Sequence, residues 1–260
     1  MKRDTIKKQA PLTYYGGKRR MIQYILPMIP KHKIYVEPYF GGGTVFFAKN
    51  PSYLEVINDI DSQLVNFYLQ IQTNYNTLKE KIDLSLYSEE LYKWSKLVYY
   101  NQIKASDLDR AYATWLVFNM SINSCPECGW SYNNGTGGSH SGKLLAPKRD
   151  SFCPWLKERM RYVQISQRPA IKIIQERDSV DTFFYLDPPY HYAGFTLEDL
   201  EELLRVLESI KGKFLLSNYP AEILREYANK NSWQLTEINI KQDITNQMKR
   251  RKKKKEVLIQ

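Results

Sequence analysis

The stretch FFYLDPPY, residues 183–190, joins an apolar run to an abrupt polar stop. Its first four residues predict a strand buried on both faces, because no polar residue alternates with the apolar ones. The two prolines cannot continue that strand, since neither has a backbone N–H to donate to a sheet. Asp187 is therefore expected at the carboxyl end of a core strand. Such strands are typical of parallel sheets covered by helices, so the stretch indicates an α/β fold.

Strands and helices alternate on both sides of this stretch, which predicts a mainly parallel sheet with helices on its faces. Further strands are predicted at residues 34–36, 53–59, 170–178, 213–220, 232–240 and 256–260. Helices are predicted at residues 62–75, 196–210 and 221–231, the first of them beginning at a Ser62 cap.

The alternation breaks between residues 74 and 168. Two helical patterns that begin at Ser88 and Ser106 precede a stretch rich in Gly, Ser and Asn at residues 121–150, which predicts a long loop. A structureless loop of this length is usually functional. The predicted domains are a catalytic domain of residues 1–73 and 169–260 and an inserted domain of residues 74–168.

The composition favours a globular protein with a polyanionic partner. The chain has 38 Lys+Arg against 28 Asp+Glu, a formal net charge of +10, and a hydrophobic fraction of 43% that allows a sizeable core. No apolar run approaches the roughly 20 residues that span a bilayer, and the N-terminus lacks the apolar core of a signal peptide. We expect a cytoplasmic protein, nucleoid-associated in a bacterial or phage-infected cell, that binds nucleic acid and no membrane.

A glycine-rich turn follows the first strand at VEPYFGGGTVFF. Glu37 ends the strand, and Phe40, Gly41 and Gly43 belong to the turn, where glycines allow positive φ and close approach of a ligand. Asp59 ends the next strand, where an acid typically accepts hydrogen bonds from ribose hydroxyls. The spacing is not G-x-G-x-x-G, so these residues predict a nucleoside cofactor rather than a dinucleotide.

The tetrapeptide Asp187, Pro188, Pro189 and Tyr190 suits chemistry on an exocyclic aromatic amine. Such an amine is a poor nucleophile, because its lone pair is delocalised into the ring. A carboxylate and a rigid backbone carbonyl can each accept one of its N–H bonds, which favours a pyramidal, nucleophilic nitrogen in the transition state. Tyr190 offers a flat face on which the base can stack. An isolated DPP would be a plain turn, but here the strand end and the glycine turn agree with the catalytic interpretation.

At this point the sequence resembles a known family, the Dam-type DNA adenine-N6 methyltransferases. The resemblance lies, in chain order, in YYGGK, EPYFGGGTVFF, NDID, YLDPPY, LLSNYP and KKEVLIQ, and it leaves out the 74–168 insertion. It implies a Rossmann-like α/β methyltransferase fold, with a helical and loop insertion for target recognition between the cofactor turn and DPPY. It also implies transfer of a methyl group from S-adenosylmethionine to the N6 of an adenine flipped out of double-stranded DNA.

The resemblance also assigns individual residues. Tyr14, Lys18, Asp59 and Asp187 match positions that contact S-adenosylmethionine, and Asp178 loosely matches an acid on a strand that faces the adenine of the cofactor. A cognate restriction enzyme is a partner that this family implies. Cytosine-N4 methylation, RNA adenine-N6 methylation and a non-catalytic module that binds S-adenosylmethionine or DNA are the alternatives. The target sequence and the oligomeric state stay open.

Two segments are expected to contact the nucleic acid. In the loop, stacking and base-edge contacts are predicted for Trp130, Tyr132 and Asn133. The run KRRKKKK, residues 249–255, lies between two predicted strands, so it is a loop of the fold and not a tail. Phosphate contacts are predicted for Lys252, Lys253 and Lys254. A solvated run of charges is the alternative interpretation.

The three cysteines do not predict a secreted disulfide framework, because their number is odd. Cys125 and Cys128 have the spacing of a zinc knuckle, which His140 and Cys153 could complete. No second C-x-x-C follows, so we predict no metal site, with this zinc site as the alternative.

Overall fold

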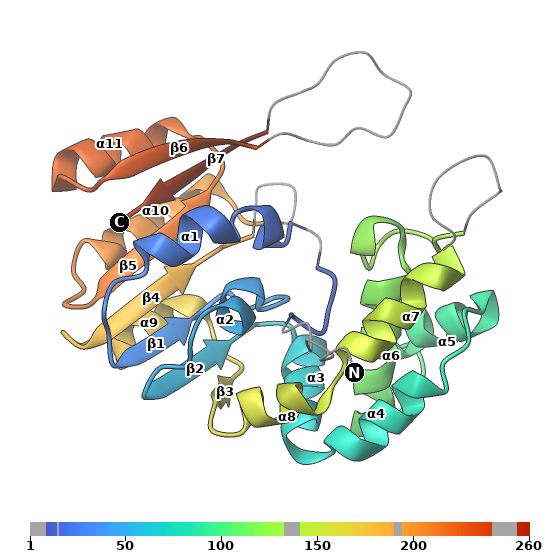
Figure 1. Ribbon diagram of the computed structural model, residues 1–260. Coiled ribbons are helices and arrows are strands. Elements are labelled where there is room, and N and C mark those ends of the chain that lie inside the picture. Colours follow the sequence, from blue (N-terminus) through green and yellow to red (C-terminus); the bar gives the residue numbers. More distant parts are fainter. Residues whose placement is uncertain (1–8, 15, 133–140, 190–193, 241–253) are drawn as a thin grey trace, which may run out of the picture. The chain divides into compact units, whose positions relative to one another are not determined.

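The computed structural model describes residues 9–14, 16–132, 141–189, 194–240 and 254–260 (Figure 1). The chain divides into two compact units. The first unit consists of Met1–Arg19, Gly41–Pro51 and Asp59–Gln167, and the second of Arg20–Phe40, Ser52–Asn58 and Arg168–Gln260. The predicted catalytic and inserted domains, with their boundaries near residues 74 and 168, stay a prediction.

The second unit contains six strands of the sheet, in the order β2-β1-β4-β5-β7-β6. They are β1 Ile34–Glu37, β2 Leu54–Asn58, β4 Thr182–Leu186, β5 Lys213–Asn218, β6 Leu235–Ile240 and β7 Lys254–Ile259. β1 pairs in parallel with β2 and β4, and β4 with β5, whereas β7 is antiparallel to β5 and β6. The mainly parallel α/β fold predicted from the sequence is confirmed.

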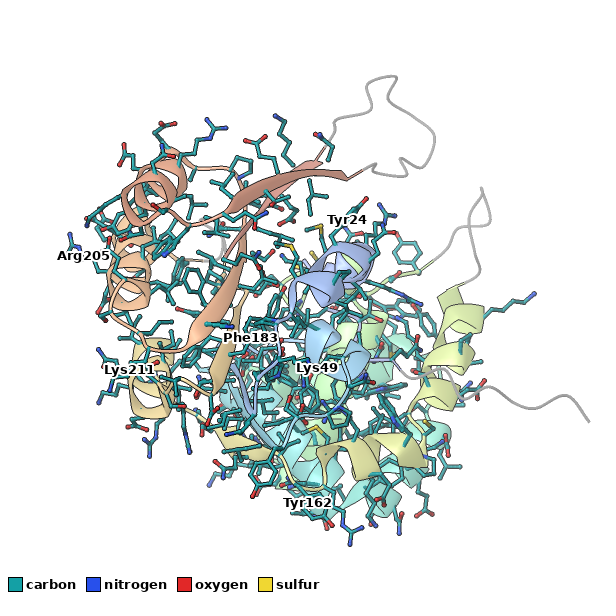
Figure 2. All side chains as sticks on the ribbon, turned by 60° about the vertical axis from the view of Figure 1, so that its left-hand side comes forward. Tyr24, Lys49, Tyr162, Phe183, Arg205 and Lys211 are labelled. Carbon is teal, nitrogen blue, oxygen red and sulfur yellow. The ribbon has the colours of Figure 1, made fainter. Side chains whose placement is uncertain are left out.

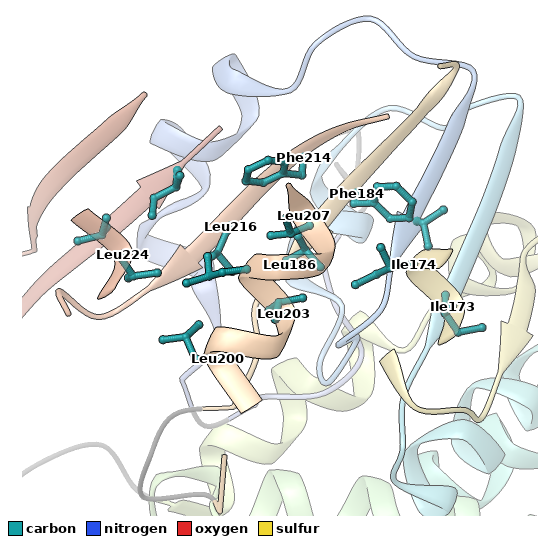
Figure 3. Packing of buried hydrophobic residues seen from close by; sticks show 14 of the residues in the cluster. Ile173, Ile174, Phe184, Leu186, Leu200, Leu203, Leu207, Phe214, Leu216 and Leu224 are labelled. Carbon is teal, nitrogen blue, oxygen red and sulfur yellow. The ribbon is translucent and has the colours of Figure 1, made fainter. Parts of the chain in front are cut away.

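One face of this sheet is covered by helices of the same unit. The unit's helices are α1 Ile22–Met28, α9 Ala170–Arg177, α10 Leu197–Leu207 and α11 Glu222–Asn231. Phe184 and Leu186 of β4 pack in one core with residues of α9, α10 and α11 (Figure 3). α10 buries four leucines there, Leu200, Leu203, Leu204 and Leu207, and its Arg205 points to the outside (Figure 2). This packing holds β4, and with it the residue that follows, in a fixed place within the unit.

The strand predicted over residues 170–178 is wrong, because Ala170–Arg177 form α9. β-branched isoleucines favour a strand by propensity. However, the buried Ile173 and Ile174 are flanked by exposed Lys172 and Gln175, a spacing that fits one buried face of a helix. Burial of these two side chains in the core outweighs the weak helix propensity of isoleucine.

The first unit is mainly helical. Its elements are α2 Thr44–Ala48, α3 Ser62–Thr73, α4 Tyr75–Asp83, α5 Glu89–Tyr99, α6 Asp107–Met120, the 3-10 turn η2 Ile122–Ser124, α7 Ser141–Ser151, α8 Pro154–Met160 and the short strand β3 Gln164–Ser166. A second 3-10 turn, η1 Lys18–Arg20, lies where the chain leaves this unit. None of the helices within the described residues is both long and apolar enough to cross a membrane.

Side-chain caps begin three of these helices. The Ser88 and Ser106 hydroxyls cap α5 and α6, as the sequence predicts. α3 is capped by Asp61 and not by Ser62, because the Asp61 carboxylate accepts the Gln63 N–H at 2.8 Å. The prediction for Ser62 was therefore wrong by one residue.

The loop predicted over residues 121–150 is wrong for its last part, which forms α7 in spite of Pro147. Leu145 of this helix is buried, and the Lys148 ammonium donates to the carbonyl of Asn119 at 2.9 Å, so tertiary contacts hold the segment as a helix. The first part forms a hairpin of residues 121–130, in which Ser121 pairs antiparallel with Trp130. We use the term hairpin for these ten residues below.

Candidate active site

Asp187 directly follows β4, whose five residues are all buried. The carboxyl ends of β1 and β4 lie at the same edge of the sheet, because Val36 pairs with Phe184 in parallel register. Here the strand order changes direction, since β2 lies on the far side of β1 and β5 on the far side of β4. Ligands of open α/β sheets bind at such a switch point. Glu37 and Asp187 therefore end the two strands where a ligand is expected.

Carboxylates and phenols gather on one face at this edge. Glu37 is buried and accepts a hydrogen bond from the Tyr35 hydroxyl, with 2.7 Å between the oxygens. Tyr185 is also buried, and burial raises its pKa well above the ordinary value, with smaller contributions from the charges of Asp187 and Glu37. The phenol therefore stays protonated. The acidic surroundings suit a ligand that presents N–H donors or positive charge.

Asn58 ties the loops at this edge together, a role that we did not predict from the sequence. Its side-chain amide donates to the carbonyls of Pro38 and Arg168, at 2.9 Å each, and its side-chain oxygen accepts the Arg168 N–H at 3.0 Å. Its own carbonyl accepts the N–H of Phe40 at 3.0 Å. A polar residue that ends a core strand is the signal that could have indicated this role.

In the first unit, Asp59 joins the glycine turn to the start of α3. One carboxylate oxygen accepts the Gly41 N–H at 2.7 Å, and the other accepts the Asp61 N–H at 3.0 Å. Gly41 and Gly43 have φ of 49° and 63°, a backbone conformation that other residues rarely adopt. Burial raises the pKa of the Asp59 carboxyl to about 6, although the backbone N–H bonds oppose the shift. Asp59 is therefore a carboxylate that titrates close to neutral pH.

Tyr14 lies directly over the same glycine turn. A Cβ atom on Gly42 would lie 2.5 Å from Tyr14 Cβ, and one on Gly41 would lie 2.9 Å from Tyr14 Cε1. The turn therefore needs glycine at these positions to make room for the Tyr14 ring. Lys18, in the same N-terminal segment, is buried at 3% exposure. The hydroxyl of Tyr68, a residue that sequence reasoning missed, donates to the Gly41 carbonyl at 2.9 Å.

Asp178 lies away from Asp187. It precedes β4, at the amino end of the strand that Asp187 ends, and its carboxylate accepts the backbone N–H groups of Lys211 and Gly212 at 2.9 Å. The interpretation of Asp178 as a cofactor residue depended on a strand at residues 170–178. Because that segment is α9, Asp178 joins two loops of the second unit and is not carried into the proposal below.

The hairpin presents an aromatic group. The Trp130 ring contacts two tyrosine rings. Its centroid lies 5.6 Å from that of Tyr87 and 6.0 Å from that of Tyr132. Tyr132 is 71% exposed, so it is the ring of the three that is best placed to meet a partner. Asn133 and the catalytic candidate Tyr190 lie outside the described residues, as do Lys252 and Lys253. Lys254 begins β7, but its side chain is not among those described.

Cys125 and Cys128 share a turn, whereas Cys153 belongs to another element. Cys128 donates its N–H to the Cys125 carbonyl at 3.0 Å within the hairpin, and Cys153 is a buried residue at the start of α8. His140 lies outside the described residues. Among the residues that the structure describes, no three His, Cys, Asp or Glu side chains group as metal ligands.

Comparisons with known proteins agree with these features. The sequence matches the family of D12 class N6 adenine-specific DNA methyltransferases over residues 14–244. The type II methyltransferase M1.LlaDCHI of Lactococcus lactis subsp. cremoris is 29% identical over 246 residues, covering 81% of this chain and 81% of the relative. The DNA adenine methylase of Vibrio cholerae serotype O1 is 26% identical over 220 residues, covering 78% and 76%. The DNA N-6-adenine-methyltransferase of Escherichia phage P1 is 25% identical over 232 residues, which cover 81% of this chain and 30% of that protein.

Proposed function

This chain belongs to the family of D12 class N6 adenine-specific DNA methyltransferases, and we propose that S-adenosylmethionine is its methyl donor and Asp187 its amine-binding residue. Membership of this family means methylation of adenine N6 in DNA, which sets aside the cytosine-N4, RNA and non-catalytic alternatives. The observation that carries the proposal is the position of Asp187 at the carboxyl end of β4, beside the end of β1 at the switch point of the sheet.

The donor is assigned to the glycine turn of the first unit. The Asp59 carboxylate has about four lone-pair positions, of which one accepts the Gly41 N–H and another the Asp61 N–H, with the Ile60 N–H as a further neighbour, so it can still accept a hydrogen bond from a ribose hydroxyl. The positive φ of Gly41 and Gly43 brings the backbone close to such a ligand, and the Tyr14 ring adds an apolar surface. When bound, S-adenosylmethionine supplies a methyl group already activated as a sulfonium.

The target amine is assigned to Asp187 and the proline turn that follows it. The Asp187 carboxylate accepts one N–H of the adenine amine, and a backbone carbonyl of the Pro188-Pro189 turn accepts the other. With both N–H bonds accepted in this way, the lone pair of the nitrogen would be free to attack the methyl group that S-adenosylmethionine would supply, with S-adenosylhomocysteine as the leaving group. The proton that leaves the methylated nitrogen has Asp187 as its first acceptor. The base must leave the duplex to reach this residue, and Tyr190 stacks on it.

We assign target recognition to the hairpin and to Tyr132, and phosphate contacts to the basic run at residues 249–255. The Lactococcus relative is named a type II methyltransferase, and its similarity supports a cognate restriction enzyme as the partner of this chain.

The test uses Asp187→Ala with Asp181→Ala as its control. Asp181 lies at the amino end of β4, half-exposed and paired with Lys33 at 3.0 Å, so its loss removes an acid of the same strand at the opposite edge. Methyl transfer from labelled S-adenosylmethionine to DNA is measured, and methylated adenines are mapped by sequencing DNA from cells that express each variant. Asp187→Ala is expected to bind DNA but to lose transfer by several orders of magnitude, whereas Asp181→Ala keeps it. Turnover of Asp187→Ala within about tenfold of wild type would contradict the mechanism.

A further inference from the structure

We infer that Phe118 is a positioning residue shared by the glycine turn and the hairpin, so that it influences both donor affinity and target preference. The inference rests on the proposed function and deepens it, because it names a residue on which both parts of that function depend. Phe118 lies in the last turn of α6 and is 2% exposed. It acts through its neighbours and touches neither ligand itself.

Phe118 reaches the glycine turn through Tyr14. The two rings are stacked, with centroids 5.1 Å apart and planes at 22°. The Tyr14 side chain in turn contacts the glycine turn, because it fills the space beside Gly41 and Gly42. The neighbouring residues reinforce the contact, since the Thr13 hydroxyl donates to the side-chain oxygen of Asn119 at 3.2 Å. The ring of Phe118 therefore supports the N-terminal segment where it covers the turn.

A second set of contacts leads from Phe118 to Asp59. The Tyr99 ring meets Phe118 edge-on, with centroids 5.9 Å apart and planes at 83°. The Tyr99 hydroxyl donates to the Asp61 carboxylate at 2.8 Å, and the Asp61 N–H donates to Asp59 at 3.0 Å. Phe118 thus contacts two of the residues that lead to the donor turn, Tyr14 and Tyr99.

Phe118 also belongs to the last turn of α6, and the hairpin directly follows this helix. The carbonyl of Met120, where α6 ends, accepts the Ser131 N–H at 2.8 Å, and Ser121 pairs with Trp130. The Asn119 carbonyl accepts the Lys148 ammonium at 2.9 Å. A shift of this last turn therefore moves both ends of the hairpin together.

α5 holds the hairpin from a second direction. The Tyr92 hydroxyl lies 3.0 Å from the Ser121 hydroxyl and donates to the Cys128 carbonyl at 2.6 Å. These contacts do not include Phe118, so the hairpin should stay folded when the Phe118 ring is lost. The expected effect is a small displacement of its base and not its unfolding.

Phe118→Leu keeps an apolar side chain and removes the ring. The stabilisation that one aromatic pair contributes changes an equilibrium constant by about two- to tenfold. We therefore expect the affinity for S-adenosylhomocysteine to fall by about that factor. The preference for a duplex carrying the mapped target over a scrambled duplex should fall by a similar factor. If Phe118 only stabilised the fold, its replacement would lower the fraction of folded protein. That loss would reduce the apparent affinities for the target and the scrambled duplex equally, so their ratio would not change.

Leu116→Ala is the matched control, because Leu116 is fully buried on the same helix and has no part in the contacts above. It should lower the melting temperature without changing the dissociation constant of S-adenosylhomocysteine or the target preference. If Phe118→Leu does not fold, Phe118→Met takes its place. The inference would be overturned if the Phe118 variant kept the wild-type dissociation constant of S-adenosylhomocysteine or the wild-type target preference. It would also be overturned if Leu116→Ala changed both of these quantities in the same way. A wild-type chain that methylates no DNA would refute the proposed function instead.

Discussion

Asp59→Asn tests the donor site through its pH dependence. The Asp59 carboxyl has a pKa of about 6 in the folded protein, against an ordinary value of 3.8, and burial is the largest cause. Between these two values the folded chain without ligand binds more protons than the unfolded chain, so ionisation of Asp59 lowers stability as the pH rises through this range. This shift in the pKa of Asp59 lowers the free energy of unfolding by at most about 3 kcal/mol. Donor binding should have the opposite pH dependence, because the ionised carboxylate is the better acceptor of hydrogen bonds from ribose hydroxyls.

The magnitude follows from the hydrogen bonds that a charged acceptor makes. Such bonds contribute about 1.5–3 kcal/mol, so Asp59→Asn should weaken donor binding at pH 8 by roughly ten- to a hundredfold. The asparagine side chain also cannot reproduce the present geometry, since Gly41 and Asp61 each donate an N–H to a different carboxylate oxygen and an amide has only one oxygen. Asp59→Ala should weaken binding by a similar amount, because it removes both acceptors.

The assay is calorimetric titration with S-adenosylhomocysteine between pH 5 and 8, a range in which the ligand's own amino and carboxyl groups keep their charges. The wild-type dissociation constant should be constant above about pH 7 and should rise about tenfold from pH 7 to pH 5. The Asp59→Asn constant should be larger at pH 8 and independent of pH, while Asp181→Asn should behave as wild type. Equal affinity of wild type and Asp59→Asn at pH 8 would remove Asp59 from the donor site. A wild-type constant that does not vary between pH 5 and 8 would refute the requirement for an ionised carboxylate.

Two further predictions concern DNA. Exchange of residues 121–150 for the matching segment of a related enzyme should change the methylated sequence, as mapped by sequencing, and leave S-adenosylhomocysteine affinity unchanged; an unchanged sequence would place recognition elsewhere. Replacement of Lys252 to Lys255 with Gln should flatten the dependence of log K on log salt by up to about 3.6, and by about half of that if two residues contact phosphates. Preference for the target over scrambled DNA should barely change, because phosphates carry no base information. A salt dependence equal to that of wild type would show that the run is only solvated.

The sequence predicted the fold best where the signal was local. The apolar run before Asp187 predicted a core strand, and the structure confirms β4 with all five residues buried. The segment 170–177 was misassigned because the propensity of isoleucine and the spacing of the buried residues pointed to different structures. The spacing was the better guide, since burial of Ile173 and Ile174 in the core decides the outcome. The prediction of Asp178 as a cofactor residue depended on that strand.

The long loop shows a second limit. Gly, Ser and Asn at residues 131–142 suggested that irregular structure continues to residue 150. α7 forms nevertheless, because Leu145 is buried and Lys148 binds the Asn119 carbonyl. Partners of this kind lie far away in the sequence, and no pattern within the segment itself identifies them.

The glycine turn shows what a correct motif leaves undetermined. From the sequence, we attributed its glycines to close approach of a ligand. In the structure, Gly41 and Gly42 make room for the side chain of Tyr14, which stands 27 residues before Gly41. A side chain at either position would therefore displace the Tyr14 ring, whether or not a ligand is bound.

Gly43 differs, because its positive φ at the start of α2 is reason enough for glycine there. The same motif therefore contains glycines required for two different physical reasons. Gly41 combines the two reasons, because it makes room for Tyr14 and has a positive φ. It also donates its N–H to Asp59. A substitution at Gly41 should consequently disturb Tyr14 and Asp59 together, whereas one at Gly42 should act through Tyr14 alone.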